Sequence, residues 1–508
     1  MNDYPSLSRE ARGWLRFLHR KIRIADDWTI KGTPSEAWDA RTSPPTLNWH
    51  RFDLTFASIA VAMMAEITPA WREVYTQILD HLAARMTTYW AWHDWIEQRG
   101  EDPQRGNYPP AYLQLLIPPG YAGKYNVPGW AGNGMAPHPF EPDPIATAGA
   151  LYYKGFFNFV IGLYEYVSGS HRYDQPFELV YDEATRFTYD HSAIAETLAR
   201  QWIERAEGIH CEVRKIWPMC SFLAGLGSRL YDVMHRVDRH WAFLSWYEHA
   251  KRQYVSPVNG HPPEWLTLYY DPDTGVNLKT QDARGWLLAT LFLAPHDRRL
   301  ARWLYEGAKR RFLVEAGTGG AHFTAVSGCP GDDAFSTAIG LAVANEMGDE
   351  GVCVQLRKWV ERYYQPVDDT GRGEFYFRFR LRDPFPRGQY NDLIMPAFVG
   401  TTGTWSDIFA APNLAKFRQP TVEGVDFDRL AVSQAFYDDD LHTLVVAVTP
   451  AVAGDRGGET SFRVTGVEPG ARYTVNVDGH GPRRAKMTDG SLEIRTTVAD
   501  HSFTIKAQ

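Results

Sequence analysis

The sequence predicts a mainly helical protein, an (α/α)6 barrel followed by a small C-terminal antiparallel β-sandwich, from three observations. From about residue 7 to residue 410, apolar residues recur at three- and four-residue spacing, which is typical of amphipathic helices. Short Gly/Pro breaks indicate antiparallel hairpins, and about ten to twelve helices fit the span, enough for six pairs to close into a barrel. After residues 411–424 the period changes to two, which is typical of strands.

Individual elements follow from start and stop signals. The clearest helix is expected at 69–96, with Thr68 as N-cap and Pro69 at the first helical position. Further helices are expected at 147–168, 192–207, 217–235, 239–255, 283–294, 298–315, 333–347 and 350–364. The barrel domain is predicted to span 1–415, and the β-sandwich, which carries no obvious catalytic cluster, to span 425–508.

One long segment interrupts the helical pattern. Residues 99–145 are dense in Pro, Gly and aromatic residues and cannot form one helix. Loops of this length are usually functional or disordered, and the aromatic content favours an ordered lid or a subunit contact.

Composition excludes several classes of function. The net charge is −8 and no long basic run is present, so nucleic acid is not an expected partner. The sequence has no G-x-x-x-x-G-K-[ST], H-E-x-x-H or G-x-S-x-G motif, and its 4 cysteines form no C-x-x-C pair. We therefore expect no nucleotide cofactor and no metal. With no secretory signal and no apolar stretch of membrane-spanning length, a soluble cytoplasmic protein is expected.

Aromatic residues make up 14% of the chain, more ring surface than ordinary core packing requires. One interpretation is an aromatic-rich helical core. The other is an aromatic-lined pocket for an apolar, cationic or sugar ligand, and the two are compatible.

Two of the cysteines lie close together in "GIHCEVRKIWPMCSF". Pro218 is expected in the first turn of a helix, which places Cys220 near a helix N-terminus, where the macrodipole favours thiolate. Cys211 would lie on the preceding loop, with Glu212 able to act nearby. The thiols could then converge on one ligand, one accepting a proton while the other donates one. The alternative is that both are buried small hydrophobic residues.

The surrounding motifs are similar to those of the linalool dehydratase-isomerase family. In that family a Y-K-G-x-x-N-x-x-x-G-L-Y-x-x-x-x-G-S-x-R-Y stretch precedes C-E-x-x-x-x-x-x-x-C. The matching residues here are Tyr153, Lys154, Gly155, Asn158, Gly162, Leu163, Tyr164, Gly169, Ser170, Arg172 and Tyr173, then Cys211, Glu212 and Cys220. The resemblance covers about residues 20–400 and omits the predicted β-sandwich.

The resemblance implies an (α/α)6 barrel in a ring-like homo-oligomer, with an apolar pocket between neighbouring subunits. It also implies cofactor-independent movement of water onto or off allylic or tertiary terpenoid alcohols. By the same resemblance Cys211 and Cys220 are the acid/base pair, assisted by Glu212. Tyr153 and Trp217 are expected to help shape the cavity.

The chain departs from the family pattern at several pocket positions. The family's catalytic His is Phe156 here, and a pocket Tyr is Phe52; both are expected to line the cavity. The family's Asp and Tyr that polarise the substrate hydroxyl fall at Arg23 and Thr29. A disulfide position is occupied by Thr33.

A further pocket Tyr of the family falls at Asp282, which introduces a carboxyl group. In an aromatic-lined cavity this group could serve as a general acid or protonate an alkene, as in terpenoid cyclisation. The structural alternative is an N-cap for the helix that starts near Ala283.

The leading hypothesis is therefore a lyase or isomerase of this family type that acts on a small apolar terpenoid or alkenol substrate. An (α/α)6 toroid followed by a β-sandwich also suits a glycoside hydrolase or polysaccharide lyase, with Asp282 opposed by Glu264 or Asp332 as the carboxylate pair. The remaining alternative is a terpenoid cyclase-like or binding protein.

Overall fold

A computed structural model describes most of the chain. The described residues are 4–38, 50–92, 143–211, 215–258, 260–272, 275–317, 319–325, 332–379, 388–485 and 487–507. Nearly all of the predicted lid at 99–145 lies outside them, as does Glu212.

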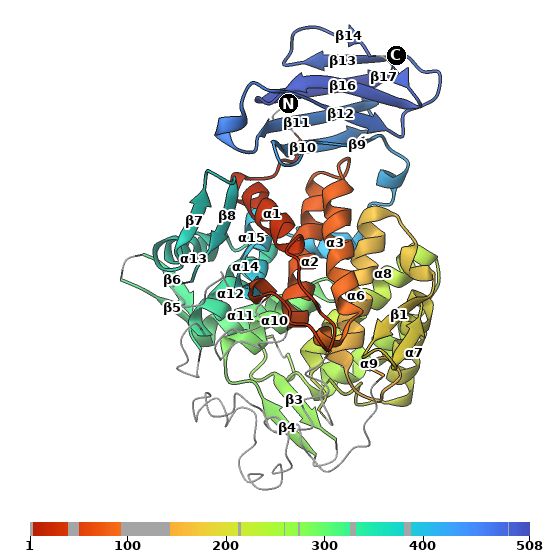
Figure 1. The fold of residues 1–508 in the computed structure, drawn as a ribbon. Coiled ribbons are helices and arrows are strands. Elements are labelled where there is room, and N and C mark those ends of the chain that lie inside the picture. Colours follow the sequence, from red (N-terminus) through yellow and green to blue (C-terminus); the bar gives the residue numbers. More distant parts are fainter. Residues whose placement is uncertain are drawn as a thin grey trace.

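The part up to residue 410 is mainly helical, as predicted (Figure 1). The helices are α1 Arg9–Ile22, α2 His50–Ile67, α3 Glu73–Met86, α6 Leu151–Ser168, α7 His191–Glu204, α8 Pro218–His235, α9 Trp241–Gln253, α10 Ala283–Leu293, α11 Arg298–Phe312, α12 Asp332–Met347, α13 Glu350–Tyr363, α14 Gly388–Ile394, α15 Pro396–Val399 and α16 Thr404–Ala410. Side chains cap several helix starts, for example Asp190 at α7 and Asp297 at α11. None of the described helices combines the length and apolar character needed to cross a bilayer.

The helix predicted at 69–96 is wrong at both ends. Helix α3 begins at Glu73 and ends at Met86, and its N-cap residue is Arg72. Thr68 instead closes the preceding helix, because its backbone N–H donates to the Met64 carbonyl at 3.0 Å. Its hydroxyl lies 2.7 Å from the hydroxyl of Tyr75, so it is not available to cap a new helix.

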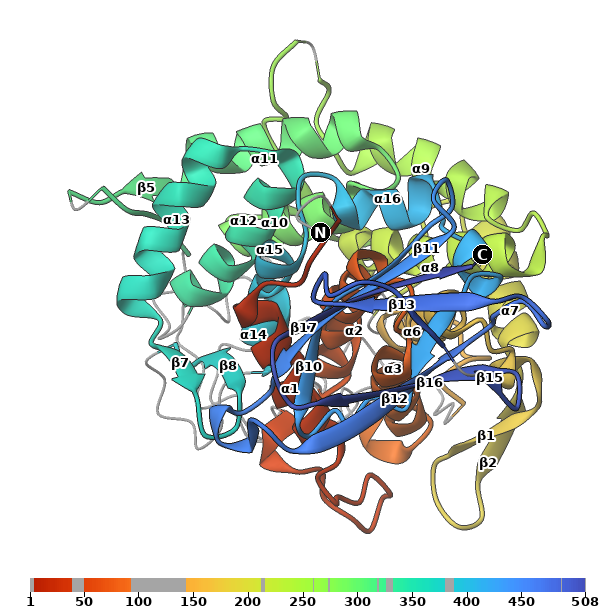
Figure 2. The ribbon, with the colours of Figure 1, turned by 90° about the horizontal axis from the view of Figure 1, so that it is seen from above.

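Six of the helices form a closed series of neighbours. Helix α2 packs on α6, α6 on α8, α8 on α10, α10 on α12, α12 on α14, and α14 again on α2. Helices α3, α7, α9, α11 and α13 pack against members of this series, and Figure 2 shows α7, α9, α11 and α13 along the outside of the molecule. Each inner helix is therefore buried on several sides.

Helices α6 and α8 run in the same direction, and α2 and α14 begin side by side. On α6 and α8, Gly155 approaches Ala224 and Gly162 approaches Leu230, so residue numbers rise together along the pair. The first residue of α14, Gly388, contacts the Asp53 side chain in the first turn of α2. The N-terminal ends of these helices consequently lie at the same end of the molecule.

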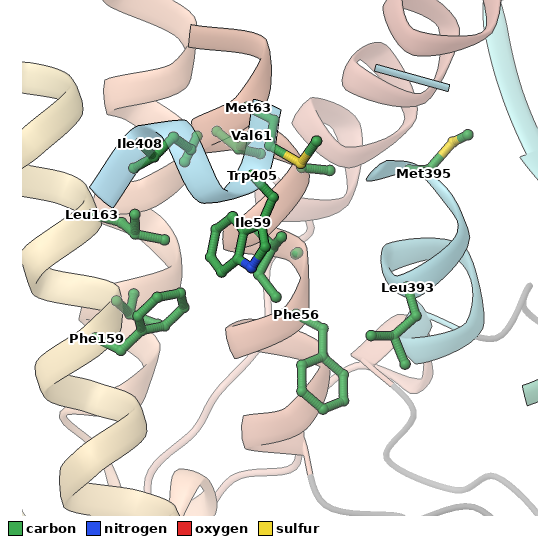
Figure 3. Packing of buried hydrophobic residues seen from close by; sticks show 14 of the residues in the cluster. Phe56, Ile59, Val61, Met63, Phe159, Leu163, Leu393, Met395, Trp405 and Ile408 are labelled. Atoms are coloured by element: carbon green, nitrogen blue, oxygen red, sulfur yellow. The ribbon is translucent and has the colours of Figure 1, made fainter. Parts of the chain in front are cut away.

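The opposite end of the helical part is filled by apolar side chains. Trp405 of α16 is fully buried, packs against Phe159 of α6 with ring centroids 6.1 Å apart, and donates its indole N–H to the Leu291 carbonyl at 2.9 Å. Figure 3 shows Trp405 and Ile408 among side chains of α2 and α6. Helix α16 thus occupies the space between inner helices near their C-terminal ends.

The C-terminal part consists of two antiparallel sheets, which confirms the predicted β region. Their strand orders are β10-β11-β17-β13-β14 and β15-β16-β12-β9. The bounds are β9 Thr421–Glu423, β10 Leu430–Asp438, β11 Thr443–Pro450, β12 Glu459–Thr465, β13 Tyr473–Val477, β14 Arg483–Arg484, β15 Met487–Thr488, β16 Ser491–Thr497 and β17 His501–Ala507. Phe462 and Phe503, one from each sheet, pack with ring centroids 5.1 Å apart.

Four hairpins extend from the helical part among the residues that the structure describes. They are β1 Phe177–Val180 with β2 Arg186–Tyr189, β3 Thr267–Asp271 with β4 Val276–Lys279, β5 Leu313–Glu315 with β6 Ala321–Phe323, and β7 Pro366–Asp369 with β8 Glu374–Phe377. In Figure 1 the β3–β4 hairpin lies at the end of the molecule opposite the C-terminal sheets.

Candidate active site

The two cysteines predicted to act together are buried thiols. Cys211 is fully buried and Cys220 is 6% exposed, and neither forms a disulfide. Cys220 is the third residue of α8, after Trp217 at the N-cap and Pro218 in the first turn. The predicted place of Cys220 at a helix N-terminus is therefore confirmed.

The segment before α8 is fastened on two sides. The Cys211 N–H donates to the Lys215 carbonyl at 2.7 Å, which closes the intervening loop. Ile216 then exchanges two backbone hydrogen bonds with Tyr270 of β3, at 2.8 and 2.9 Å. On the other side, the His210 carbonyl accepts from the N–H of Leu151, the first residue of α6, at 3.1 Å. Cys211 is consequently held beside the start of α6.

Cys220 lies on the face of α8 that packs on α6. Ala224, one helical turn after Cys220, faces Gly155 so closely that a Cβ on this glycine would come 2.5 Å from the Ala224 Cβ. Residues four apart share a helix face, so Cys220 points toward the first turn of α6. Cys211 and Cys220 thus approach the same helix start, one from the loop and one from α8.

Two of the four predicted lining residues meet near this end. Phe52 of α2 and Phe156 of α6 pack edge to face, with ring centroids 5.7 Å apart. Both are nearly buried, at 7% and 1% exposure. Phe52 also packs on Phe56 at 5.5 Å, and the Arg51 guanidinium lies 4.6 Å from its ring centroid. Phe52 and Phe156 thus form an aromatic contact between α2 and α6, with the charged Arg51 guanidinium beside it.

The other two predicted lining residues, Tyr153 and Trp217, have different surroundings. Tyr153 donates its hydroxyl to the Met86 carbonyl at 2.7 Å, and its ring packs on Trp92 and Phe157, so it lies between α3 and α6. Burial raises the pKa of this hydroxyl well above its usual value. Trp217 packs on Tyr269 of β3 at 5.4 Å, and its buried indole nitrogen has no hydrogen-bond partner within the described chain.

Asp282 is the N-cap of α10, as the structural alternative predicts. Its Oδ1 accepts from the Gly285 N–H at 3.2 Å, and its Oδ2 pairs with the Arg284 guanidinium at 2.6 Å. Both oxygens therefore have a structural use, and a catalytic role stays a prediction. Glu264, one carboxylate proposed to oppose Asp282 in a sugar-cleaving site, is exposed, whereas Asp282 is 6% exposed. The side chain of Asp332 lies outside the described part.

Sequence reasoning gave no role to the lysine of the Y-K-G motif. Lys154 is fully buried and donates to the carbonyls of Ile145 at 2.8 Å and Thr147 at 2.5 Å, and to Oε1 of Gln201 at 2.9 Å. These hydrogen bonds hold the chain leading into α6 against α7. The presence of Lys154 in the motif was the one sign in the sequence that this residue has a role, but the motif does not show which groups its ammonium binds.

Two buried polar side chains near α8 were also missed. Asn158 of α6 faces Gly227 of α8, and neither its amide nitrogen nor its amide oxygen bonds to a residue that the structure describes. The hydroxyl of Ser221, next to Cys220, is buried and equally without a described partner. Such groups are rare in folded proteins and often mark a functional position or a water site.

Comparison with known proteins bears on this site. Residues 130–379 match the family model for linalool dehydratase/isomerase. This range includes both cysteines, Tyr153, Phe156, Trp217 and Asp282, but not Phe52.

Two of the solved structures that match do so with low TM-scores. One is a GH127 β-L-arabinofuranosidase from Geobacillus stearothermophilus T6, with 11% identity and a TM-score of 0.30 over 97% of this chain and 76% of that chain. Another is endoglucanase CelQ from Clostridium thermocellum complexed with cellotriose, with 10% identity and a TM-score of 0.31 over 98% of this chain and 92% of that chain. Scores this low support no conclusion about fold or activity. The family match, in contrast, agrees with the motifs in the sequence, and the chain belongs to the linalool dehydratase/isomerase family.

Proposed function

We propose that the protein is a cofactor-independent lyase or isomerase that acts on an apolar terpenoid or alkenol substrate, with Cys211 and Cys220 as acid and base. Family membership supports an enzyme of the linalool dehydratase-isomerase type. The observation that carries the finer proposal is that both thiols are buried, not joined to each other, and directed toward the start of α6.

The chemistry requires two proton transfers. In dehydration, one thiol donates its proton to the substrate hydroxyl, the C–O bond breaks, and water leaves. The other sulfur, as thiolate, removes a proton from the adjacent carbon, and the C–H electron pair becomes the new double bond. The two sulfurs exchange protonation states, and hydration follows the same transfers in reverse.

The surroundings suit an apolar substrate. Phe52 and Phe156 place two aromatic rings where the family pattern has a Tyr and a His. Exclusion of water from such a site strengthens electrostatic interactions between the reacting groups and prevents loss of protons to solvent. We assign Trp217 and Tyr153 to the shape of the pocket, Trp217 because it precedes Cys220 and Tyr153 because it fixes α6 against α3.

The proposed architecture is an (α/α)6 barrel at 1–415 followed by an accessory β-sandwich at 425–508. The closed series of inner helices supports the barrel. Since α16 fills space near the C-terminal ends of these helices, the proposed pocket opens at their N-terminal ends. By family resemblance, a neighbouring subunit of a homo-oligomer would complete it.

Cysteine substitutions test the mechanism. Purified wild type, Cys211→Ser and Cys220→Ser are incubated with tertiary and primary allylic alcohols, and the alkene and isomeric alcohol products are measured by gas chromatography. Loss of a general acid or base lowers turnover by about 100-fold or more, so both variants should fall by this amount with unchanged melting temperature. The matched control is Cys353→Ser, because Cys353 is a half-buried free thiol on α13. Full turnover in either active-site variant would reject the mechanism.

One added variant separates the two roles of Asp282. Asn is as good an N-cap as Asp but carries no charge and no acidic proton, so Asp282→Asn preserves the cap of α10. Turnover that falls about 100-fold while the fold is retained would support a general acid, and turnover within about twofold of wild type would restrict Asp282 to capping and to its ion pair with Arg284.

A further inference from the structure

Four side chains with metal-binding atoms converge at the C-terminal ends of α6 and α8. They are Glu165 near the end of α6, His171 and Asp174 in the short turn that follows it, and His235, the last residue of α8. One ligand atom from each lies within 4.8 Å of all the others. Fifteen residues of helix, about 22 Å, separate this group from Cys220 at the start of α8.

We propose that this group, Glu165, His171, Asp174 and His235, binds a zinc ion. Zinc prefers four ligands in a tetrahedron, and bonds of about 2.0–2.1 Å place neighbouring ligand atoms about 3.3 Å apart. The His235 Nε2 lies 3.1 Å from Oε2 of Glu165 and 3.5 Å from Oδ1 of Asp174. The His171 Nδ1 lies 2.9 Å from Oδ2 of Asp174. These three separations are close to the tetrahedral value, and the two that involve Asp174 use different oxygens of its carboxylate.

The kind of ligand also favours zinc over magnesium or calcium. Two imidazole nitrogens and two carboxylates suit zinc, whereas magnesium and calcium prefer a larger set of oxygen ligands. The ligands come from two helix ends and one turn, and occupancy would join these three segments. We therefore expect the zinc ion to have a structural role, because the site lies at the end of the helices opposite the proposed acid/base pair.

Residues around the group hold its ligands in place. Glu165 is fully buried, and its second oxygen, Oε1, lies 2.8 Å from Nδ1 of the buried His191, an outer contact of the kind that orients metal-binding carboxylates. The His235 ring stacks on Tyr231 with centroids 4.2 Å apart. In contrast, the His171 and Asp174 side chains are 50% and 31% exposed, so an ion can reach the site from solvent.

A cluster of ion pairs without metal is the competing explanation, and metal titration of the full chain distinguishes the two. The protein is stripped with dipicolinate and titrated with Co²⁺ and then Zn²⁺. We expect about one equivalent of each, with the intense visible absorption of tetrahedral Co²⁺, which Zn²⁺ abolishes by displacement. Zn²⁺ should also raise the melting temperature, because it binds only the folded chain.

Exposed ligands supply variants that keep the fold. His171→Ala and Asp174→Asn should each weaken Zn²⁺ binding at least about tenfold and remove the thermal stabilisation. His249→Ala is the matched control, because His249 is a partly exposed histidine of α9 outside the group. Wild-type binding below about a tenth of an equivalent, or equal affinity in the two ligand variants and the control, would overturn the proposal. Neither outcome depends on the proposed activity, since the readouts are binding and melting temperature.

Discussion

The close approach of α6 to α8 predicts a measurable difference between two glycines of the family motif. A Cβ on Gly155 would come 2.5 Å from the Cβ of Ala224, whereas non-bonded carbons prefer about 3.5–4.0 Å. The two helices must therefore separate by about 1 Å in Gly155→Ala, and overpacking of this kind costs about 1–3 kcal/mol. Alanine regains about 1 kcal/mol through its helix propensity, which leaves a net loss of up to about 2 kcal/mol.

Gly162 lies on the same helix and serves as the control. A Cβ there would meet the Leu230 Cβ at 3.1 Å, a contact that a shift of a few tenths of an ångström relieves. The propensity gain should then offset the cost, and Gly162→Ala should be neutral or slightly stabilising. In urea unfolding followed by tryptophan fluorescence, we expect Gly155→Ala to be less stable than Gly162→Ala by up to about 2 kcal/mol.

The same pair of variants should differ in activity. Ala224 is one turn from Cys220, so separation of the helices at Gly155 displaces the thiol from the start of α6. We expect Gly155→Ala to lose turnover and the double variant Gly155→Ala/Ala224→Gly to recover part of it, because the added carbon is removed from the facing helix. Equal stability and equal turnover of Gly155→Ala and Gly162→Ala would refute the reasoning.

Two further predictions concern buried charged or titratable side chains. Lys21 and Asp53 form a buried ion pair at 2.6 Å, so Lys21→Met should lower the free energy of unfolding by about 3–5 kcal/mol. The control is Lys309→Met, which removes a more exposed pair and should cost about 1 kcal/mol or less. Similar losses for the two variants in urea unfolding would contradict this prediction. Burial, with a contribution from a nearby arginine, lowers the pKa of His240 to about 4. The unfolded chain then binds a proton that the folded protein does not, and stability should fall by up to about 3 kcal/mol as the pH drops from about 6.5 to 4. Urea unfolding across this range should show a shallower fall for His240→Phe, and an unchanged slope would exclude His240 as its source.

Helix ends were predictable where a residue type fixes them. Pro218 cannot donate a backbone hydrogen bond and therefore favours the first turn of a helix, and α8 does begin there. Asp282 caps α10 because its side-chain oxygen accepts a hydrogen bond from a backbone N–H in the first turn of the helix. Thr68 misled the prediction because its hydroxyl bonds within the preceding turn and to Tyr75, a choice set by tertiary contacts.

Side-chain direction was harder to predict than position. Helix α6 is buried on every side, from Leu151 to Val167, so it has no apolar stripe that would show which face points where. Tyr153 and Phe156 are only three residues apart, yet one contacts α3 and the other contacts α2. The His and carboxylate group at the far end was missed because its members meet only through the pairing of α6 with α8.

The family motif on α6 is therefore best explained as a means of positioning α6 rather than as part of the chemistry. Lys154 binds the chain that leads into the helix, and Gly155 and Gly162 permit its close approach to α8. The groups proposed to react, Cys211 and Cys220, lie on neighbouring segments that this pairing brings to the start of α6. Because Lys154, Gly155 and Gly162 are not among the proposed lining residues, the residues at the positions of Phe52 and Phe156 can change while the thiols keep their place. This chain combines an intact motif with phenylalanine at two of the proposed lining positions, and under the proposed function a substrate with less polar character there is the expected consequence.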